Sequence, residues 1–133
     1  MESEIILQKS WPFLGVKYSP CHTKALVCSN NSKLYTFDVN SDNAIKKEPT
    51  CIVTEPEGSL YDFAWYPFVK PSVKESFIFL STGSGIPIHL WDANNGCLKA
   101  SYCGVNKNTG EHMSAISLSF NTYGNHVVSN KIL

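Results

Sequence analysis

Apolar and aromatic residues recur at every second position in three stretches of this chain, namely GVKYSP, DFAWYP and SLSFNT. Their first alternating residues, Val16, Phe63 and Leu118, are separated by 47 and 55 residues. Alternation with a period of two is typical of a half-buried β-strand, because successive side chains of a strand point to opposite faces. The pattern predicts three copies of one strand.

Further strand candidates fill the intervals between these copies. Two of them, KLYTFDV and IHLWDAN, contain an aromatic residue followed by aspartate. Short β-rich segments precede them, ALVCS and FIFLS, and others follow them, CIVTE and CLKASY. The connections are rich in Asn, Gly, Pro and Lys, and no stretch shows sustained helical periodicity. The repeating unit is therefore predicted to contain four strands.

A four-stranded unit with a period somewhat above the roughly 40 to 45 residues of a WD repeat is typical of a β-propeller blade. We predict an all-β fold, a partial WD-repeat β-propeller of about two complete four-stranded blades plus the start of a third. The expected division is an N-terminal stub at 1–10, a first blade at 11–57, a second blade at 58–103, and a loop with an incomplete third blade at 104–133.

The second blade has sequence neighbours on both sides, so we expect it to be the best ordered. Its buried residues are predicted to be Tyr61, Phe63, Trp65, Leu80, Leu90 and Trp91. The third blade is expected to hold one complete strand and a stub, which would leave apolar sheet surface uncovered. We therefore expect a truncated isoform, a gene-model fragment or an excised portion, and a chain that is aggregation-prone or partly folded alone.

Charge and composition narrow the classes of partner. The chain of 133 residues has eleven basic and eleven acidic residues, and every basic residue is lysine. A balanced charge gives no net electrostatic attraction to nucleic acid or anionic lipid. Without arginine, the chain has no guanidinium group to form paired hydrogen bonds with guanine or phosphate. The acidic N-terminus and short apolar runs predict an intracellular, non-secreted chain without membrane association.

Candidate chemistry is sparse. The five cysteines form no C-x-x-C pair, and the imagined zinc set of Cys21, His22 and Cys28 lacks a fourth ligand. The STGSG segment at 81–85 lacks the remaining residues of a phosphate loop or a serine elbow, so a turn is expected there. The histidines are scattered. We assign no catalytic residue, no metal ligand and no cofactor.

Several of these stretches carry a family resemblance. YDFAWYPF, IPIHLWDANNGCLKASY and SLSFNTYGN together resemble the WD-repeat domain of the telomerase Cajal body protein family. The resemblance implies a nuclear, non-catalytic scaffold that binds small Cajal body RNAs and telomerase RNA and directs these ribonucleoprotein particles to Cajal bodies. Protein partners are also expected. The alternative is a WD-repeat protein-interaction module without RNA binding, and the RNA-binding residues are unknown.

The chain departs from the usual WD-repeat hydrogen-bond pattern. A typical blade has a Gly-His pair before its first strand, and the histidine joins an aspartate in the turn between the second and third strands. That pair is absent before Phe63, and Asn31 and Gly85 replace the turn aspartates. We therefore expect these blades to depend more on aromatic packing.

If RNA contacts this portion, we expect unpaired bases to stack on exposed aromatic rings while lysines neutralise phosphates. The candidate lysines are Lys70, Lys74 and Lys107, which lie in predicted loops. The alternative is that these three are ordinary solvated lysines on long connections.

Overall fold

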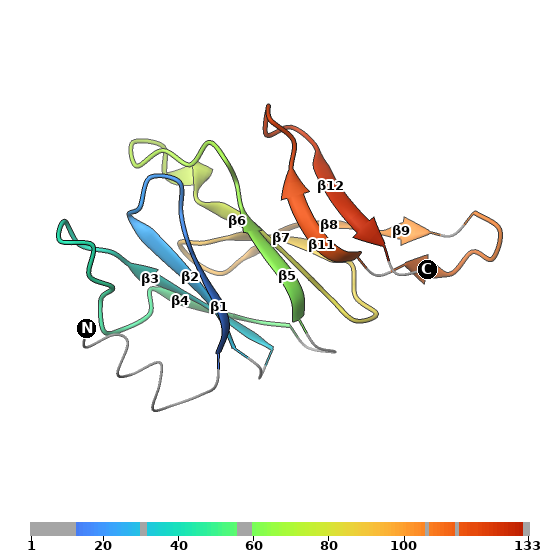
Figure 1. Ribbon diagram of the computed structural model, residues 1–133, viewed down its shortest axis with the longest axis horizontal. Coiled ribbons are helices and arrows are strands. Elements are labelled where there is room, and N and C mark those ends of the chain that lie inside the picture. The colour runs from blue at the N-terminus through green and yellow to red at the C-terminus, as the bar shows by residue number, and fades with distance from the viewer. Residues whose placement is uncertain (1–12, 30–31, 56–59, 106, 114, 132–133) are drawn as a thin grey trace.

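A computed structural model describes residues 13–29, 32–55, 60–105, 107–113 and 115–131. The regular structure of this part is β-strand apart from one 3-10 helix, η1 (Lys74–Ser76). The strands form two four-stranded and two two-stranded antiparallel sheets (Figure 1). The predicted all-β fold is confirmed, with sheets of the kind that form propeller blades. Within the described ranges, no helix is long and apolar enough to cross a membrane.

The first sheet is a meander in which each strand pairs with the next along the chain. Its strands are β1 (Phe13–Tyr18), β2 (Lys24–Ser29), β3 (Lys33–Asp38) and β4 (Cys51–Thr54). All three pairings within it are antiparallel and join strands that are consecutive in the sequence. The four segments proposed from alternation and β-rich composition are strands.

The second sheet repeats this order. Its strands are β5 (Leu60–Trp65), β6 (Ile78–Gly83), β7 (Ile88–Asp92) and β8 (Leu98–Tyr102). The STGSG segment runs from the end of β6 into the turn before β7, and Gly85 adopts a positive φ of 69° there. Because no helix follows this segment, it offers no helix N-terminus to an anion.

The last part of the chain differs from its expected form in two respects. Strand β11 (Ala115–Phe120) pairs with β12 (Val127–Lys131), so a full five-residue strand stands where a stub was expected. The expected loop at 104–112 also contains β9 (Gly104–Val105), which pairs with β10 (His112–Met113). Strands of two residues are too short to show alternation, so the sequence pattern could not predict this hairpin.

The strands β1, β5 and β11, which begin the two four-stranded sheets and the β11–β12 sheet, share a structural irregularity. Each pairs with its neighbour through a register shift near its start, at Phe13/Gly15, Leu60/Asp62 and Ala115/Ser117. A β-bulge adds one residue to a strand and changes which face the following side chains occupy. The shared position of the bulge supports the internal repeat that was inferred from the sequence.

The bulge also explains an incorrect burial prediction. Tyr61 was expected in the core with Phe63 and Trp65, but its side chain is 42% exposed. Leu60, on the other side of the bulge, is buried instead. Strict alternation places Tyr61 on the same face as Phe63 and Trp65, because it takes no account of the bulge between Leu60 and Asp62.

The sheets stand side by side in chain order, and their first strands β1, β5 and β11 are neighbours (Figure 1). The largest buried cluster joins the first two sheets and is rich in aromatic residues. Of the other residues predicted to be buried, Leu90 is only half-buried. The remaining four are buried, namely Phe63, Trp65, Leu80 and Trp91.

Candidate functional site

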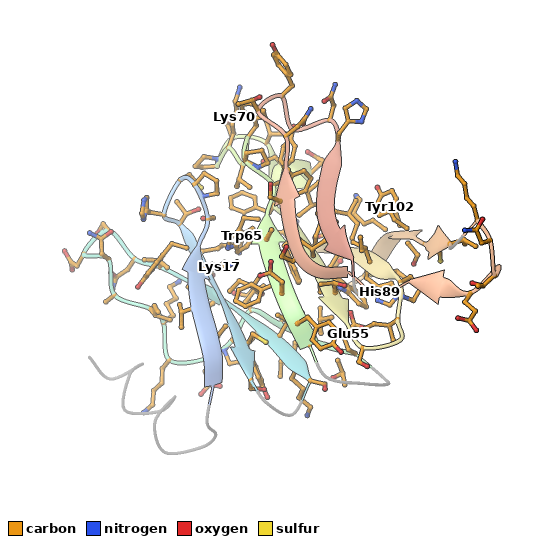
Figure 2. All side chains as sticks on the ribbon, turned by 45° about the vertical axis from the view of Figure 1, so that its right-hand side comes forward. Lys17, Glu55, Trp65, Lys70, His89 and Tyr102 are labelled. Carbon is orange, nitrogen blue, oxygen red and sulfur yellow. The ribbon has the colours of Figure 1, made fainter. Side chains whose placement is uncertain are left out.

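A buried polar network connects the end of the first sheet to the second sheet. The Glu55 side chain is fully buried just after β4, and its Oε1 accepts a 2.6 Å hydrogen bond from Ser81 Oγ. His89 Nδ1 lies 3.0 Å from both carboxylate oxygens of Glu55. Trp91 Nε1 donates to Ser81 Oγ at 2.8 Å, and the Trp91 ring stands edge-on to the His89 ring. Glu55 and His89 are labelled close together in Figure 2.

This network adds buried polar contacts to the aromatic packing that was expected of these blades. The second sheet does contain a hydrogen-bonded chain of four side chains, although the residues and their positions differ from the usual pattern. A glutamate from the preceding sheet occupies its centre, and the histidine comes from the third strand. Ser81 and His89 lie opposite each other in the β6–β7 register, which the fold shows and the sequence pattern did not identify.

The network is arranged for structure and not for nucleophilic attack. An activated serine nucleophile needs a base that accepts its proton and a route to substrate. Ser81 is fully buried, its hydroxyl donates to Glu55, and its oxygen accepts from Trp91. Its hydrogen bond to Glu55 links the second sheet to the segment after β4, and its hydrogen bond from Trp91 lies within the second sheet.

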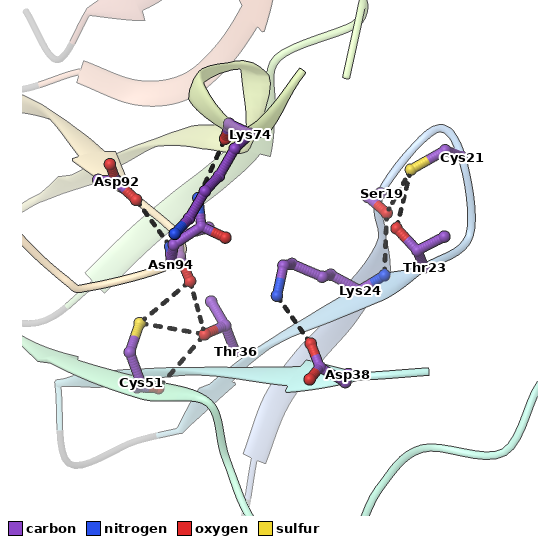
Figure 3. Close-up of polar contacts among 11 residues, drawn as sticks. Ser19, Cys21, Thr23, Lys24, Thr36, Asp38, Cys51, Lys74, Asp92 and Asn94 are labelled. Carbon is purple, nitrogen blue, oxygen red and sulfur yellow. Dashed lines mark hydrogen bonds and ion pairs between the residues drawn. The ribbon is translucent and has the colours of Figure 1, made fainter. Parts of the chain in front are cut away.

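A second polar contact joins the two sheets at the other end of the third strands (Figure 3). Thr36 Oγ1 on β3 donates to the carbonyl of Ala93 at 3.1 Å, and Cys51 Sγ lies 3.3 Å from the same oxygen. Asp92 Oδ1 accepts from the amide of Asn94 at 2.7 Å and shapes the turn after β7. Asp92 thus organises a turn that the first sheet holds in place.

Asp38, the equivalent residue of the first sheet, forms an ion pair. Lys24 Nζ lies 2.7 Å from Asp38 Oδ1 (Figure 3). The hydrogen bond from Lys24 lowers the pKa of Asp38, although partial burial acts in the opposite direction. The two aromatic-aspartate strands therefore use the same residue type for different contacts.

The candidate lysines do not form one group. Lys70 and Lys74 are exposed in the β5–β6 loop, at the end of the molecule that also carries the β1–β2 and β11–β12 turns. Lys107 is exposed in the β9–β10 hairpin, away from that loop in Figure 1. The structure therefore places Lys70 and Lys74 on one loop and Lys107 on another.

Aromatic side chains gather at the same end of the molecule as the β5–β6 loop that carries these two lysines. The Tyr66 ring contacts the rings of Phe68 and Phe120 in edge-to-face geometry, with centroids 5.9 and 5.7 Å apart. Tyr123 follows in the β11–β12 turn, and its side chain is 80% exposed. We call these four residues the aromatic end surface. Sequence reasoning expected exposed aromatics in general but did not identify these residues.

The cysteines and histidines offer no metal centre in the described part of the chain, where no group of three potential ligands comes together. All five cysteines are free thiols. Burial raises the pKa of Cys28 to about 11. Burial opposes ionisation of Cys21 too, but hydrogen bonds with Thr23 and Ser19 lower its pKa overall. Turn residue Asn31 and the side chain of His112 lie outside the described residues.

Comparison with known proteins gives a consistent set of names. The chain is 33% identical over 123 residues to the telomerase Cajal body protein 1 homolog of Drosophila melanogaster, covering 85% of this chain and 22% of that protein. It is 33% identical over 120 residues to telomerase Cajal body protein 1 of Mesocricetus auratus, with the same coverage. The Bos taurus protein is 27% identical over 132 residues, covering 94% of this chain and 24% of the relative.

Two further comparisons concern fold and family. The structure is similar to the crystal structure of the computationally designed Ika4 protein, with a TM-score of 0.57 and 13% sequence identity. That match covers 90% of this chain and 59% of the designed one, and it supports the fold alone. No protein-family model matches the sequence. The resemblance seen in the sequence is thus confirmed as a partial match, in which most of this chain is similar to between a fifth and a quarter of telomerase Cajal body protein 1.

Proposed function

We propose that this chain is part of a non-catalytic WD-repeat scaffold that binds small Cajal body RNAs or telomerase RNA in the nucleus and directs them to Cajal bodies. The observation that carries this proposal is the 33% identity to a telomerase Cajal body protein 1 homolog over 85% of the chain. Because the match spans only 22% of that relative, the RNA role is transferred as a hypothesis for this segment.

The fold is compatible with a scaffold. Two complete meander sheets, each ordered as its strands occur in the chain, provide the blade units that such a protein needs. We keep the proposed blade limits of 11–57 and 58–103, with 104–133 as the loop and incomplete third blade. The buried Glu55 network supports a non-enzymatic role, because its serine hydroxyl is committed to a structural contact.

Cross-linking in cells tests the RNA role directly. A tagged version of the full chain is irradiated with ultraviolet light, purified under denaturing conditions, and its attached RNA is sequenced. We expect enrichment of small Cajal body RNAs and telomerase RNA over the tag alone, together with nuclear foci that coincide with a Cajal body marker. Absence of direct RNA adducts would contradict the proposal.

A second candidate is a WD-repeat protein-interaction module without RNA binding. The balanced charge and the lack of arginine favour it, because phosphate contacts supply much of the affinity in most RNA complexes. The same cross-linking separates the two candidates. Proteins recovered under native conditions, without RNA adducts under denaturing conditions, would support the second.

A further inference from the structure

The aromatic end surface is held in place by a close contact between two loops. Gly124, in the β11–β12 turn, adopts a φ of 72°, and a side chain on it would come within 2.8 Å of the Phe68 ring. Only glycine accepts both the positive φ and this approach without strain. The turn that carries Tyr123 is therefore seated on Phe68, which belongs to the β5–β6 loop of the second sheet.

Three rings of this surface contact one another, and two of its four residues are exposed. Tyr66 packs between Phe68 and Phe120, so the three rings support one another through edge-to-face contacts. Phe68 remains 44% exposed and Tyr123 80% exposed. Exposed apolar residues that lie together are characteristic of an interaction surface.

The loop beneath these rings also presents positive charge. Lys70 and Lys74 are exposed on the loop that carries Phe68, whereas Glu75 is the only acidic residue between positions 66 and 77. Ser76 braces this loop, since its Oγ accepts from the amide of Lys70 at 2.8 Å and donates to the carbonyl of Val73 at 2.6 Å. Figure 2 shows Lys70 at the same end as the β11–β12 turn.

We propose that the aromatic end surface binds a single-stranded RNA segment, with unpaired bases stacked on Tyr123 and Phe68 and phosphates near Lys70 and Lys74. This inference rests on the RNA role proposed above and assigns it a location. Stacking suits a surface without arginine, because every base has an aromatic face and no bidentate reading of base edges is required. Sequence preference should be weak, and the two lysines should add a small electrostatic contribution.

Binding of the full chain to a fluorescent 12-nucleotide RNA without self-complementarity tests the stacking. We expect Tyr123→Ala to weaken binding about 5- to 150-fold, the range for loss of one stacked base. Tyr123→Phe should retain most of the affinity because it keeps the ring. Tyr102→Ala is the matched control, since Tyr102 is exposed on β8 away from this end. Annealing the complementary strand to this RNA should abolish its binding at this surface, because paired bases are not free to stack.

Salt dependence tests the lysine pair. Two neutralised phosphates predict a slope of about −1.4 for log affinity against log salt on a single strand. Lys70→Gln with Lys74→Gln should bring this contribution close to zero, while Lys107→Gln should leave the slope unchanged. Circular dichroism of each variant verifies that the sheets are retained. Tyr123→Ala should keep the fold because the Tyr123 side chain is mostly exposed to solvent.

The outcomes separate this inference from the proposed function. If the wild-type chain cross-links to RNA in cells and Tyr123→Ala binds the 12-mer equally well, the location is wrong while the RNA role stands. If the wild-type chain binds no RNA in either experiment, both fail. If Tyr123→Ala loses captured proteins but keeps its RNA affinity, the surface is a protein-docking site and the inference is overturned.

Discussion

The contact between the first and second sheets differs in kind from the contact between the second and third. The first contact is dominated by a large buried cluster that includes Leu26, Leu34, Phe63, Trp65 and Phe79. Among the described residues, the second has a smaller cluster of Leu80 and Leu118 with half-buried neighbours. It also depends on Asp62, whose Oδ2 accepts from the amide of Leu118 at 2.8 Å. Apolar burial dominates the first contact, whereas the second combines a smaller apolar cluster, the Tyr66–Phe120 ring pair and the Asp62 hydrogen bond.

Asp62 also connects the two contacts. Its Oδ1 lies 3.2 Å from Lys17 Nζ on β1, and Lys17 Nζ donates to the carbonyl of Phe63 at 2.6 Å. Trp65 Nε1 donates a 2.8 Å hydrogen bond to the carbonyl of Lys17. The first strands of all three sheets are thus tied through one residue of β5, which makes the contribution of each contact measurable by substitution.

The largest effect is expected from Phe79→Ala, which removes a fully buried ring from the first contact. Phe79 packs edge-to-face on Trp65 at 5.9 Å, so its loss leaves a cavity beside an aromatic neighbour. The free energy of unfolding should fall by about 3 to 5 kcal/mol. Urea denaturation followed by tryptophan fluorescence measures it. Tyr61→Ala, at an exposed site of β5, should change it by less than about 0.5 kcal/mol.

The next effect concerns the polar network that supports the same contact. Glu55→Gln removes the carboxylate that faces Ser81 and His89, so the free energy of unfolding should fall by about 1 to 3 kcal/mol. A double-mutant cycle with Ser81→Ala should show a coupling energy above about 0.5 kcal/mol. Additive effects would mean that the two side chains act independently. Glu75→Gln, on the exposed β5–β6 loop, is the control for loss of charge.

A smaller and local effect is expected at the second contact. Asp62→Ala leaves the amide of Leu118 without its acceptor, which should cost about 1 to 2 kcal/mol. Hydrogen exchange at the Leu118 amide should therefore accelerate about 5- to 30-fold, while the amide of Val27 in the first sheet keeps its protection. Equal acceleration at both positions would show that the three sheets open as one unit.

The smallest effect is a pH dependence within the first sheet. Lys24 lowers the pKa of Asp38 in the folded chain, so this pair adds stability above the unfolded pKa, and the contribution is lost as pH falls through the folded value. Since the Asp38 side chain is 41% exposed, the contribution should be at most about 1 kcal/mol. Unfolding measured from pH 6 to 2 should show a shallower acid decline for Asp38→Asn. Asp42→Asn, on an exposed turn, should match the wild type.

The strands were predictable because alternation is a local consequence of backbone geometry. The pattern located the strands of both complete sheets, and the aromatic residues Phe63, Trp65 and Trp91 are buried as expected. Tyr61 was misplaced because the bulge between Leu60 and Asp62 interrupts the alternation. The β9–β10 hairpin was missed because two-residue strands carry no period.

The candidate sites were less predictable because their members are distant in the sequence. Lys70 and Lys74 were found as loop lysines, but only the folded chain shows that Phe120 and Tyr123, from another sheet, lie beside their loop. The Gly124 approach to Phe68 has no counterpart in any local pattern. Spatial neighbours of this kind arise from the packing of one sheet against the next.

The sequence by itself determined the strand class, the order of the strands and the repeat of a four-stranded unit, since these follow from the period of apolar residues and the positions of turns. Tertiary structure decided which polar groups meet. Glu55 reaches Ser81, 26 residues later, and His89, 34 residues later, because two sheets pack together and bury its carboxylate. A buried carboxylate must find donors wherever the fold supplies them, and those donors are set by sheet packing and not by sequence distance.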